Sequence, residues 1–114
     1  MKVKNRVKKY NEFQKVISQG KILKSPSLTL YYLSNDLGYA RVGISIPTKS
    51  GSAVIRNKMR RQIRAILAKE LDINKSFDYI LIARRNYDIN NFEKTTSDIV
   101  SLFSKVGNNS EKIA

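Results

Sequence analysis

Residues 78–83 read Asp-Tyr-Ile-Leu-Ile-Ala, and this short stretch constrains the rest of the fold. A strand with one face in water alternates apolar and polar residues, whereas a continuous apolar run is typical of a strand covered on both faces. The stretch therefore predicts a central strand in the middle of a sheet. Other segments must then supply the neighbouring strands and the elements that cover both faces of the sheet.

Three earlier segments predict those neighbouring strands. Residues 28–33, Leu-Thr-Leu-Tyr-Tyr-Leu, have the composition of a strand, and turn residues at 35–38 separate them from a second run at 39–46. Apolar residues alternate with other types in that second run, which predicts one apolar face and one open face. We expect a brief strand at 21–23 beside them.

Two segments before the central strand predict helices. Asn11 with Gln14 three residues later resembles a capping box, apolar residues follow at helical spacing, and Gly20 offers a stop. The segment 53–70 predicts a longer helix. Its apolar positions form one stripe that should face the core: Met59, Ile63, Ile66 and Leu67.

A last helix is predicted after the central strand. Asn90 and Glu93 form a second capping-box pattern. Apolar residues then recur at helical spacing and should pack on the sheet: Phe92, Ile99, Phe103 and Val106. Together the segments predict an α+β fold, a small single-domain α/β sandwich with a four-stranded sheet and the order α-β-β-β-α-β-α.

The composition points to a polyanionic partner and limits the chemistry. Against 9 Asp and Glu the chain has 22 Lys and Arg, a formal net charge of +13 over 114 residues. It has no His, and so lacks imidazole metal ligands and the usual general base at neutral pH. Without Cys it has no thiolate metal site. Catalysis would need Lys, Tyr or carboxylate groups, or chemistry supplied by a partner.

Length and segment order predict one domain over residues 1–114. We expect its core at about residues 4–106, with a flexible basic N-terminus at 1–9 and a polar tail at 107–114. The longest apolar runs are far too short to span a bilayer, and no apolar segment of a secretion signal follows the basic start. A cytoplasmic protein without membrane association is the simple interpretation.

Residues 56–64 read Arg-Asn-Lys-Met-Arg-Arg-Gln-Ile-Arg and place cations on one face of the middle helix. At ~100° per residue the four arginines and the asparagine fall within an arc of roughly 140°. Guanidinium groups held side by side repel one another unless a polyanion lies across them, and they match phosphate oxygens in pairs. A solvated face is the alternative, but such faces interleave acids with bases, and residues 56–69 contain no acid. Nucleic acid is the favoured partner.

The motifs from residue 41 to residue 64 resemble those of a known family. They read, in order, Arg41-Val42-Gly43-Ile44-Ser45, Lys49, Gly51, Ala53-Val54, Arg56-Asn57, Arg60-Arg61 and Arg64. This series is similar to the signature of the bacterial ribonuclease P protein component. Weaker similarity at residues 12–16, 30–31 and 78–80 extends the resemblance over about residues 4–106.

The resemblance implies a fold detail and an activity. The sandwich would contain a left-handed crossover through the helix of the Arg-Asn motif, against the usual right-handed preference. The protein would have no nuclease activity alone. In the family it binds a large catalytic RNA, and the complex is an endoribonuclease that removes the 5′ leader of precursor tRNA and leaves a 5′-phosphate. The implied cofactor is Mg²⁺, held mainly by the RNA. The implied partners are ribonuclease P RNA and precursor tRNA, with no obligate protein partner.

The resemblance also assigns residues to the contact with the catalytic RNA. These are Arg56, Asn57, Lys58, Arg60, Arg61, Arg64 and Lys49. Phosphate contacts of this kind fix register rather than read sequence. A local hydrogen bond on the helix surface is an alternative role for Asn57, and a merely solvated side chain is an alternative for Lys49.

The turn before the middle helix departs from the family pattern. Relatives commonly have two lysines before the glycine and an Asn after it, whereas this chain has Thr48 and Lys49 before Gly51 and Ser52 after it. Gly51 can adopt a positive φ or allow close backbone approach, and Ser52 can cap the helix. We expect the same site with weaker electrostatics.

Three residues correspond to the family's cleft for the single-stranded leader: Phe13, Ile17 and Tyr31. Aromatic faces beside cations bind unpaired nucleotides by stacking. Ile17 stands where many relatives have an aromatic residue, which leaves one stacking surface in doubt. A core role is an equal alternative for Phe13, whereas Tyr31 can expose its ring and keep its hydroxyl in water. No metal-binding residue of the protein can be named.

Three other functions fit part of the sequence. A ribosomal or general RNA-binding protein would be small and basic, but it needs no Arg-Asn motif after a glycine turn. A DNA-binding protein would lay residues 53–70 in a major groove, although no helix directly precedes them to form a helix-turn-helix. A protein-only nuclease needs clustered acids, and the acids here are scattered. The subunit of an RNA enzyme accounts for the whole motif series.

Overall fold

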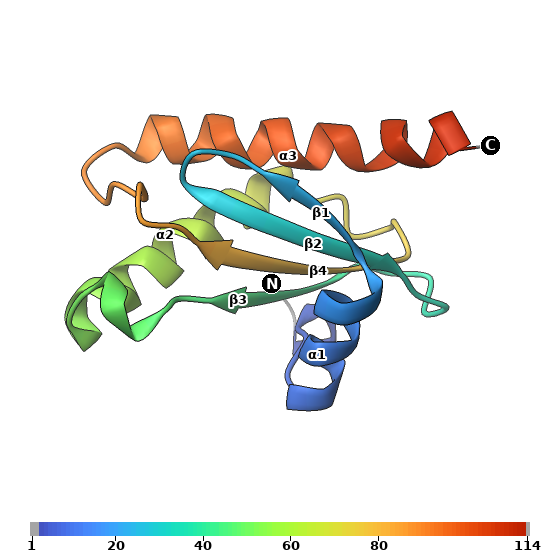
Figure 1. The fold of residues 1–114 in the computed structure, drawn as a ribbon, viewed down its shortest axis with the longest axis horizontal. Helices are drawn as coiled ribbons and strands as arrows, with labels where there is room; N and C mark the ends of the chain where they lie inside the picture. The colour runs from blue at the N-terminus through green and yellow to red at the C-terminus, as the bar shows by residue number, and fades with distance from the viewer. Residues whose placement is uncertain (1–2, 114) are drawn as a thin grey trace.

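The computed structural model describes the backbone of residues 3–113 and the side chains of residues 4–106. One mixed sheet contains β1 (Lys21–Lys24), β2 (Leu28–Ser34), β3 (Arg41–Ser45) and β4 (Phe77–Ala83), as Figure 1 shows. The order across the sheet is β1-β2-β4-β3, with β4 antiparallel to β2 and parallel to β3. The predicted central strand is confirmed, and so is the brief first strand.

Helices cover both faces of this sheet. α1 (Tyr10–Gln19) packs on one face, over β2 and β4, while α2 (Ala53–Glu70) and α3 (Phe92–Ile113) cover the other (Figure 1). Two short 3-10 turns, η1 (Val3–Asn5) and η2 (Thr48–Ser50), precede α1 and α2. The predicted element order is confirmed. None of the described helices is long and apolar enough to cross a membrane.

The connection from β3 through α2 to β4 is a left-handed crossover. Both strands run in the same direction, and Figure 1 shows α2 behind the sheet with β4 above β3. A chain that follows this path turns left-handed as it advances from one strand to the next, which is the rare sense for such connections. The crossover therefore has the handedness that the resemblance implied.

Alternation of side chains along β2 and β4 divides the core into two clusters. The larger cluster lies under α2 and α3, and its sheet residues include Leu28, Leu30, Tyr32, Tyr79 and Leu81. The smaller cluster lies under α1, with Val7, Val16 and Ile80 buried and Phe13, Tyr31, Leu33 and Ile82 packed against them. Because β4 contributes to both clusters, its sequence is apolar without a break.

α1 begins two residues earlier than the capping pattern predicted. Its first residue is Tyr10, and the backbone N–H of Lys9 donates to Oε1 of Glu12 at 3.4 Å. Asn11 instead accepts the N–H of its neighbour Glu12 at 3.0 Å. The predicted pair of Asn11 and Gln14 is therefore wrong as the cap. The stop at Gly20 is confirmed, since Gly20 follows the last helical residue as its C-cap.

α3 starts one residue later than its capping pattern indicated. Oδ1 of Asn91, rather than Asn90, accepts a backbone N–H of the first turn, that of Lys94 at 3.1 Å. Phe92 was predicted in the core but is 45% exposed, because it stands at the very start of the helix. The other predicted apolar positions do face the sheet: Ile99 and Val106 are buried and Phe103 packs against the larger cluster.

β3 is shorter than the apolar run that predicted it. The strand begins at Arg41 rather than Tyr39, because the backbone N–H of Ala40 donates to the carbonyl of Ile73, outside the sheet, at 2.9 Å. The face predicted to be open is partly covered. Gly43 is buried, and the ring of Phe13 from α1 lies over it.

The N-terminal segment packs along the outer edge of β3. Asn5 and Val7 are buried, and Nδ2 of Asn5 donates to the carbonyl of Ala40 at 2.7 Å. The N–H of Val7 donates to the carbonyl of Val42 at 3.0 Å. The expectation of a flexible start is therefore wrong for residues 5–7, and residues 1 and 2 lie outside the described part. At the C-terminal end, α3 extends to Ile113. The side chains of the predicted polar tail, residues 107–114, lie outside the described part of the structure.

Candidate nucleic-acid interface

The turn before α2 fixes the first arginine of the motif. Gly51 has a φ of 148°, a backbone conformation that residues with a side chain rarely adopt. Ser52 is the N-cap residue, and its Oγ accepts the backbone N–H of Ile55 at 3.3 Å. Nε of Arg56 donates back to the carbonyl of Gly51 at 3.2 Å. The positive φ and the cap that the sequence allowed at these two positions are both present.

α2 separates an apolar face from a cationic one. Its core stripe consists of Met59, Ile63, Ile66 and Leu67, each at most 3% exposed. Away from the core lie the predicted RNA-facing residues, of which Asn57, Lys58, Arg61 and Arg64 are exposed and Arg56 and Arg60 half-buried. Nη1 of Arg60 donates to Oδ1 of Asn57 at 3.1 Å, so Asn57 makes the local hydrogen bond that was its alternative role.

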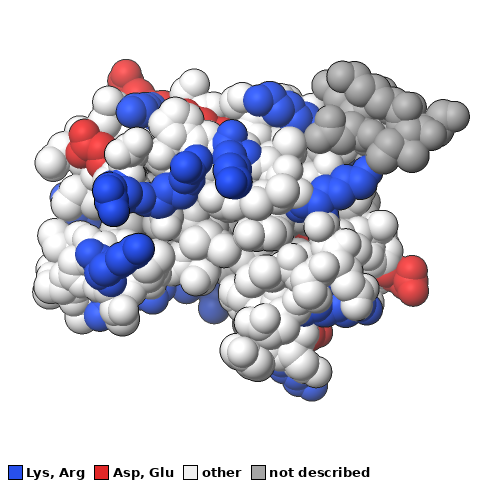
Figure 2. All heavy atoms as spheres, viewed as in Figure 1, with Lys and Arg blue, Asp and Glu red and all other residues white. Residues whose placement is uncertain are grey.

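Acidic side chains do not neutralise this cationic face. Among residues 4–106 the ion pairs belong to Arg41 on β3, and none involves an arginine of α2. Figure 2 shows the face of the molecule in front of α2, where Lys and Arg are also spread and Asp and Glu lie mainly near the edges. Unpaired cations held on a rigid helix favour binding of a polyanion over a merely solvated surface.

A groove of about 390 Å³ joins the cationic face to α1. Its lining includes Phe13 from α1, the backbone region of Gly43 on β3, and Arg60 and Arg64 from α2. The N-terminal segment adds Arg6 and Lys8, which the sequence analysis did not single out. The basic character of residues 1–9 was the available signal, but only the packing against β3 brings these two side chains to the groove.

Phe13 packs in the core, which was one of its two open roles, and it also lines the groove. Its ring packs on Gly43 so closely that a Cβ added there would lie 2.5 Å from Cζ of Phe13. The side chain also belongs to the smaller core cluster, yet it is only half-buried and lines the groove. A half-buried aromatic ring therefore lies beside four cations.

Tyr31 and Ile17 lie on the same side of the sheet as Phe13. Tyr31 on β2 packs against the smaller cluster and is half-buried. Ile17 follows Phe13 by one helical turn on α1 and is also half-buried. Neither lines the 390 Å³ groove, so the three predicted cleft residues share a face but Phe13 is the one that meets the arginines.

Lys49 lies at a different hollow from Phe13. This second hollow, of about 170 Å³, is lined by Lys49, Arg84 and Arg85 together with Met59 and Tyr87. The two arginines follow directly after β4, a doublet that the sequence analysis passed over. Lys49 itself is exposed, which fits contact with RNA and a solvated side chain equally.

The loop after β4 is anchored to α2 by Gln62, a residue inside the arginine motif. Nε2 of Gln62 donates to the carbonyl of Ile89 at 2.8 Å, and Oη of Tyr87 donates to Oε1 of Gln62 at 2.9 Å. Burial raises the pKa of Tyr87 to about 12, which keeps its hydroxyl a donor at neutral pH. The loop that carries Arg84 and Arg85 therefore has a fixed place relative to α2.

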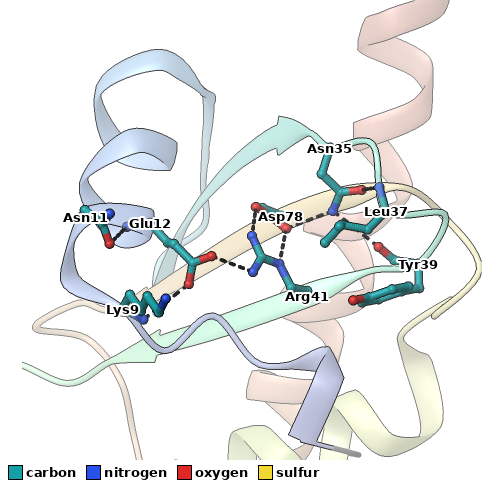
Figure 3. Close-up of polar contacts among 8 residues, drawn as sticks. All are labelled: Lys9, Asn11, Glu12, Asn35, Leu37, Tyr39, Arg41 and Asp78. Atoms are coloured by element: carbon teal, nitrogen blue, oxygen red, sulfur yellow. Dashed lines mark hydrogen bonds and ion pairs between the residues drawn. The ribbon is translucent and has the colours of Figure 1, made fainter.

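Arg41 connects α1 to the sheet (Figure 3). Its Nε and Nη2 donate to the two carboxylate oxygens of Asp78 at 2.9 and 2.7 Å, and its Nη1 donates to Oε2 of Glu12 at 2.7 Å. The hydrogen bond from Arg41 lowers the pKa of Glu12, against the opposing effect of partial burial. The hydrogen bond to Asp78 raises the pKa of Arg41, so Arg41 and Glu12 are both charged at neutral pH.

Comparison with known proteins places this arrangement in a family. The family model described as Ribonuclease P matches residues 1–107. The chain belongs to the ribonuclease P protein family. Among its relatives in that family, the ribonuclease P protein component of Mycoplasma mobile is 41% identical over 113 residues, covering 99% of each chain. That of Mesoplasma florum is 38% identical over 104 residues, covering 90% of this chain and 94% of the relative.

Solved structures of ribonuclease P proteins share the fold. The protein from Thermotoga maritima superposes with a TM-score of 0.79 at 25% identity, covering 89% of this chain and 96% of that one. The protein from Staphylococcus aureus gives a TM-score of 0.74 at 28% identity, covering 90% and 96%. The resemblance seen in the motifs of residues 41–64 is confirmed, as is the α+β fold with its mixed four-stranded sheet.

The magnesium ion that the ribonuclease P family implies does not fit the described residues of this chain. Residues 4–106 contain no group of three or more His, Cys, Asp or Glu side chains that could hold a metal ion. Glu12 and Asp78 are brought together only by Arg41, which occupies an oxygen of Glu12 and both oxygens of Asp78. No step of the chemistry is therefore assigned to a metal held by these side chains.

Proposed function

We propose that this chain is the protein subunit of ribonuclease P that binds both the catalytic RNA and the 5′ leader of precursor tRNA. It thereby promotes endonucleolytic removal of the leader, which leaves the mature 5′ end. The observation that carries the proposal is the groove in which Phe13 meets Arg60 and Arg64. One surface then offers an aromatic ring for an unpaired base and guanidinium groups for phosphates.

The cationic face of α2 supports contact with the catalytic RNA. The residues assigned to this contact are Arg56, Asn57, Lys58, Arg60, Arg61 and Arg64, with Lys49 in the neighbouring turn. Their task is to neutralise phosphate repulsion and to fix the register of protein and RNA. Each neutralised phosphate releases counterions, so affinity should fall with salt by ~0.7–0.9 in log–log slope per contact.

The leader is assigned to the α1 side of the molecule. Phe13 offers an aromatic ring at the groove, and stacking on an aromatic side chain contributes ~1–3 kcal/mol per base. Tyr31 and Ile17 extend the same face toward β2, although Ile17 gives an apolar contact in place of a stacking one. Binding of this kind would raise affinity for precursor over mature tRNA, because only the precursor has the leader.

The phosphodiester chemistry is assigned to Mg²⁺ held mainly by the RNA subunit. Metal ions bound by the RNA would supply the Lewis-acid chemistry of phosphodiester hydrolysis. The residues of this chain bind and orient RNA, and their fixed cations would lower the Mg²⁺ concentration that the ribonucleoprotein needs. The absence of His from the sequence agrees with this division of labour.

Reconstitution tests the proposal directly. The protein is mixed with its cognate ribonuclease P RNA, and precursor tRNA cleavage is measured at low millimolar Mg²⁺, with protein-only and RNA-only controls. We expect cleavage at the mature 5′ end when both components are present. Failure of folded protein to promote cleavage at any Mg²⁺ concentration would leave a general RNA-binding protein as the better account.

A further inference from the structure

Glu12 is a junction between three parts of the molecule. Its Oε1 accepts the backbone N–H of Lys9, at the end of the N-terminal segment, at 3.4 Å. Its Oε2 accepts from Arg41 of β3 at 2.7 Å, and Arg41 is in turn held by the Asp78 carboxylate of β4. Nδ2 of Asn35 donates to Asp78 at 2.8 Å, which completes a chain of polar contacts from α1 to the sheet (Figure 3).

The junction lies beside the groove. Glu12 directly precedes Phe13, whose ring rests on Gly43, two residues after Arg41 on the same strand. Arg6 and Lys8 line the groove from the N-terminal segment, which ends at Lys9. Arg60 and Arg64 stand on the other side, on a helix anchored in the larger core cluster. The Glu12 carboxylate thus joins α1 to β3, the strand that forms the floor of the groove, while Val7 ties the N-terminal segment to the same strand.

We propose that Glu12, held by Arg41, is a positioning residue that sets the spacing between Phe13 and the arginines of α2, and so fits the groove to a single-stranded leader. The inference rests on the proposed function, because it assigns the fit of the leader to a residue outside the cationic face. Arg41 has a second anchor in Asp78, so loss of Glu12 removes this tie between α1 and β3 without leaving a buried charge unpaired.

Neutralisation of Glu12 should change the binding of the leader differently if Glu12 positions the groove wall than if it acts only through its charge. Glu12 is an acid close to a groove lined by Arg6, Lys8, Arg60 and Arg64. By charge alone, its neutralisation should leave RNA affinity equal or raise it, because one repulsive carboxylate is removed. If Glu12 instead positions the groove wall, its neutralisation weakens binding of the leader even though the protein becomes more positive.

The test compares Glu12→Gln with Glu93→Gln in reconstituted holoenzyme. Glu93 lies exposed in the first turn of α3, so its substitution makes the same charge change on another part of the molecule. The readout is the ratio of the dissociation constants for mature tRNA and for leader-bearing precursor tRNA. We expect Glu12→Gln to lower this preference for precursor about three- to tenfold, the range for a partly exposed charge-assisted contact, and Glu93→Gln to leave it unchanged.

A second measurement follows the groove wall in the free protein. The chain has no Cys, so spin labels at Lys15→Cys on α1 and Ala68→Cys on α2, both exposed positions, report only the distance between these helices. Glu12→Gln should broaden the distance distribution, while Glu93→Gln should not. An unchanged distribution together with an unchanged preference for precursor would overturn the proposal.

A second variant, Glu12→Asp, keeps the proposal testable if Glu12→Gln does not fold. Glu12→Asp keeps the charge but withdraws the carboxylate by one methylene, so it should broaden the distance and lower the preference for precursor in the same direction. If both Glu12 variants match the unsubstituted protein, the positioning role is wrong. If the unsubstituted holoenzyme itself shows no preference for precursor, the proposed function fails instead, and the spin-label result still decides whether Glu12 holds α1.

Discussion

The two helices that border the groove are held to the protein in different ways. α2 has 18 residues and buries a continuous apolar stripe in the larger cluster, whereas α1 has 10 residues and buries only Val16. α1 relies in addition on the polar junction of Glu12, Arg41 and Asp78. The comparison suggests a division of roles, in which a rigid helix presents fixed cations and a lightly anchored helix forms the adjustable wall.

The prediction with the largest expected effect tests whether the core under α2 is more firmly packed than the core under α1. Ile63 on α2 and Ile80 on β4 are both fully buried, the first in the larger cluster and the second in the smaller one. Truncation of a buried isoleucine to alanine costs ~2–5 kcal/mol, and the cost is lower where neighbours can move into the cavity. Urea unfolding should therefore place Ile63→Ala near the upper end of this range and Ile80→Ala near the lower end. Equal losses, or the reverse order, would contradict the comparison.

The next effect concerns the contact between α1 and β3. A Cβ at Gly43 would lie 2.5 Å from Cζ of Phe13 and 2.9 Å from Cδ1 of Ile80. Gly43→Ala should therefore push the Phe13 ring outward and cost about 1–3 kcal/mol of stability, as overpacking of a core does. Adding Phe13→Leu should recover part of this loss in urea unfolding, since the smaller side chain leaves room. A Gly43→Ala variant as stable as the parent would mean that α1 shifts freely.

Unlike the two preceding substitutions, a substitution of Arg61 on α2 should weaken RNA binding and leave stability nearly unchanged. It is exposed and has no hydrogen bond to another described side chain, so Arg61→Ala should change the free energy of unfolding by less than ~0.5 kcal/mol. Loss of one charge-assisted phosphate contact should weaken assembly with the catalytic RNA by about 1–2 kcal/mol. The salt slope of binding should also fall by ~0.7–0.9. Unfolding of the domain with cleavage unchanged would show that Arg61 is structural.

The smallest effect is a pH dependence confined to the α1 side. Arg41 lowers the pKa of Glu12 in the folded state, so the ion pair contributes stability above the ordinary glutamate pKa and loses it as pH falls through the folded value. Between about pH 7 and about pH 3 the parent should lose up to ~1 kcal/mol more stability than Glu12→Gln, because the pair is partly exposed. Parallel stability curves for the two proteins would show that the pair contributes nothing measurable.

Local patterns predicted the elements that depend on near neighbours in the sequence. The apolar run at 78–83 predicted the central strand because both of its faces are covered. Helical spacing separated the core stripe of α2 from its arginines, and Ser52 caps the helix as its side chain allows. The same reasoning misplaced the start of α1 by two residues and that of α3 by one. At α1 the reason is tertiary, since the Glu12 side chain serves both Lys9 and Arg41.

The groove itself could not be predicted from these patterns. Asn5 is buried because its side chain donates to Ala40, 35 residues further along the chain, and no local periodicity signals such a contact. This packing places Arg6 and Lys8 beside Phe13, and the left-handed crossover places Arg60 and Arg64 opposite. The sequence by itself determined the cations, the aromatic residue and the helices and strands that carry them, because periodicity and capping act over a few residues. Only the tertiary structure decided which of these side chains meet, because that depends on contacts between segments far apart in the chain.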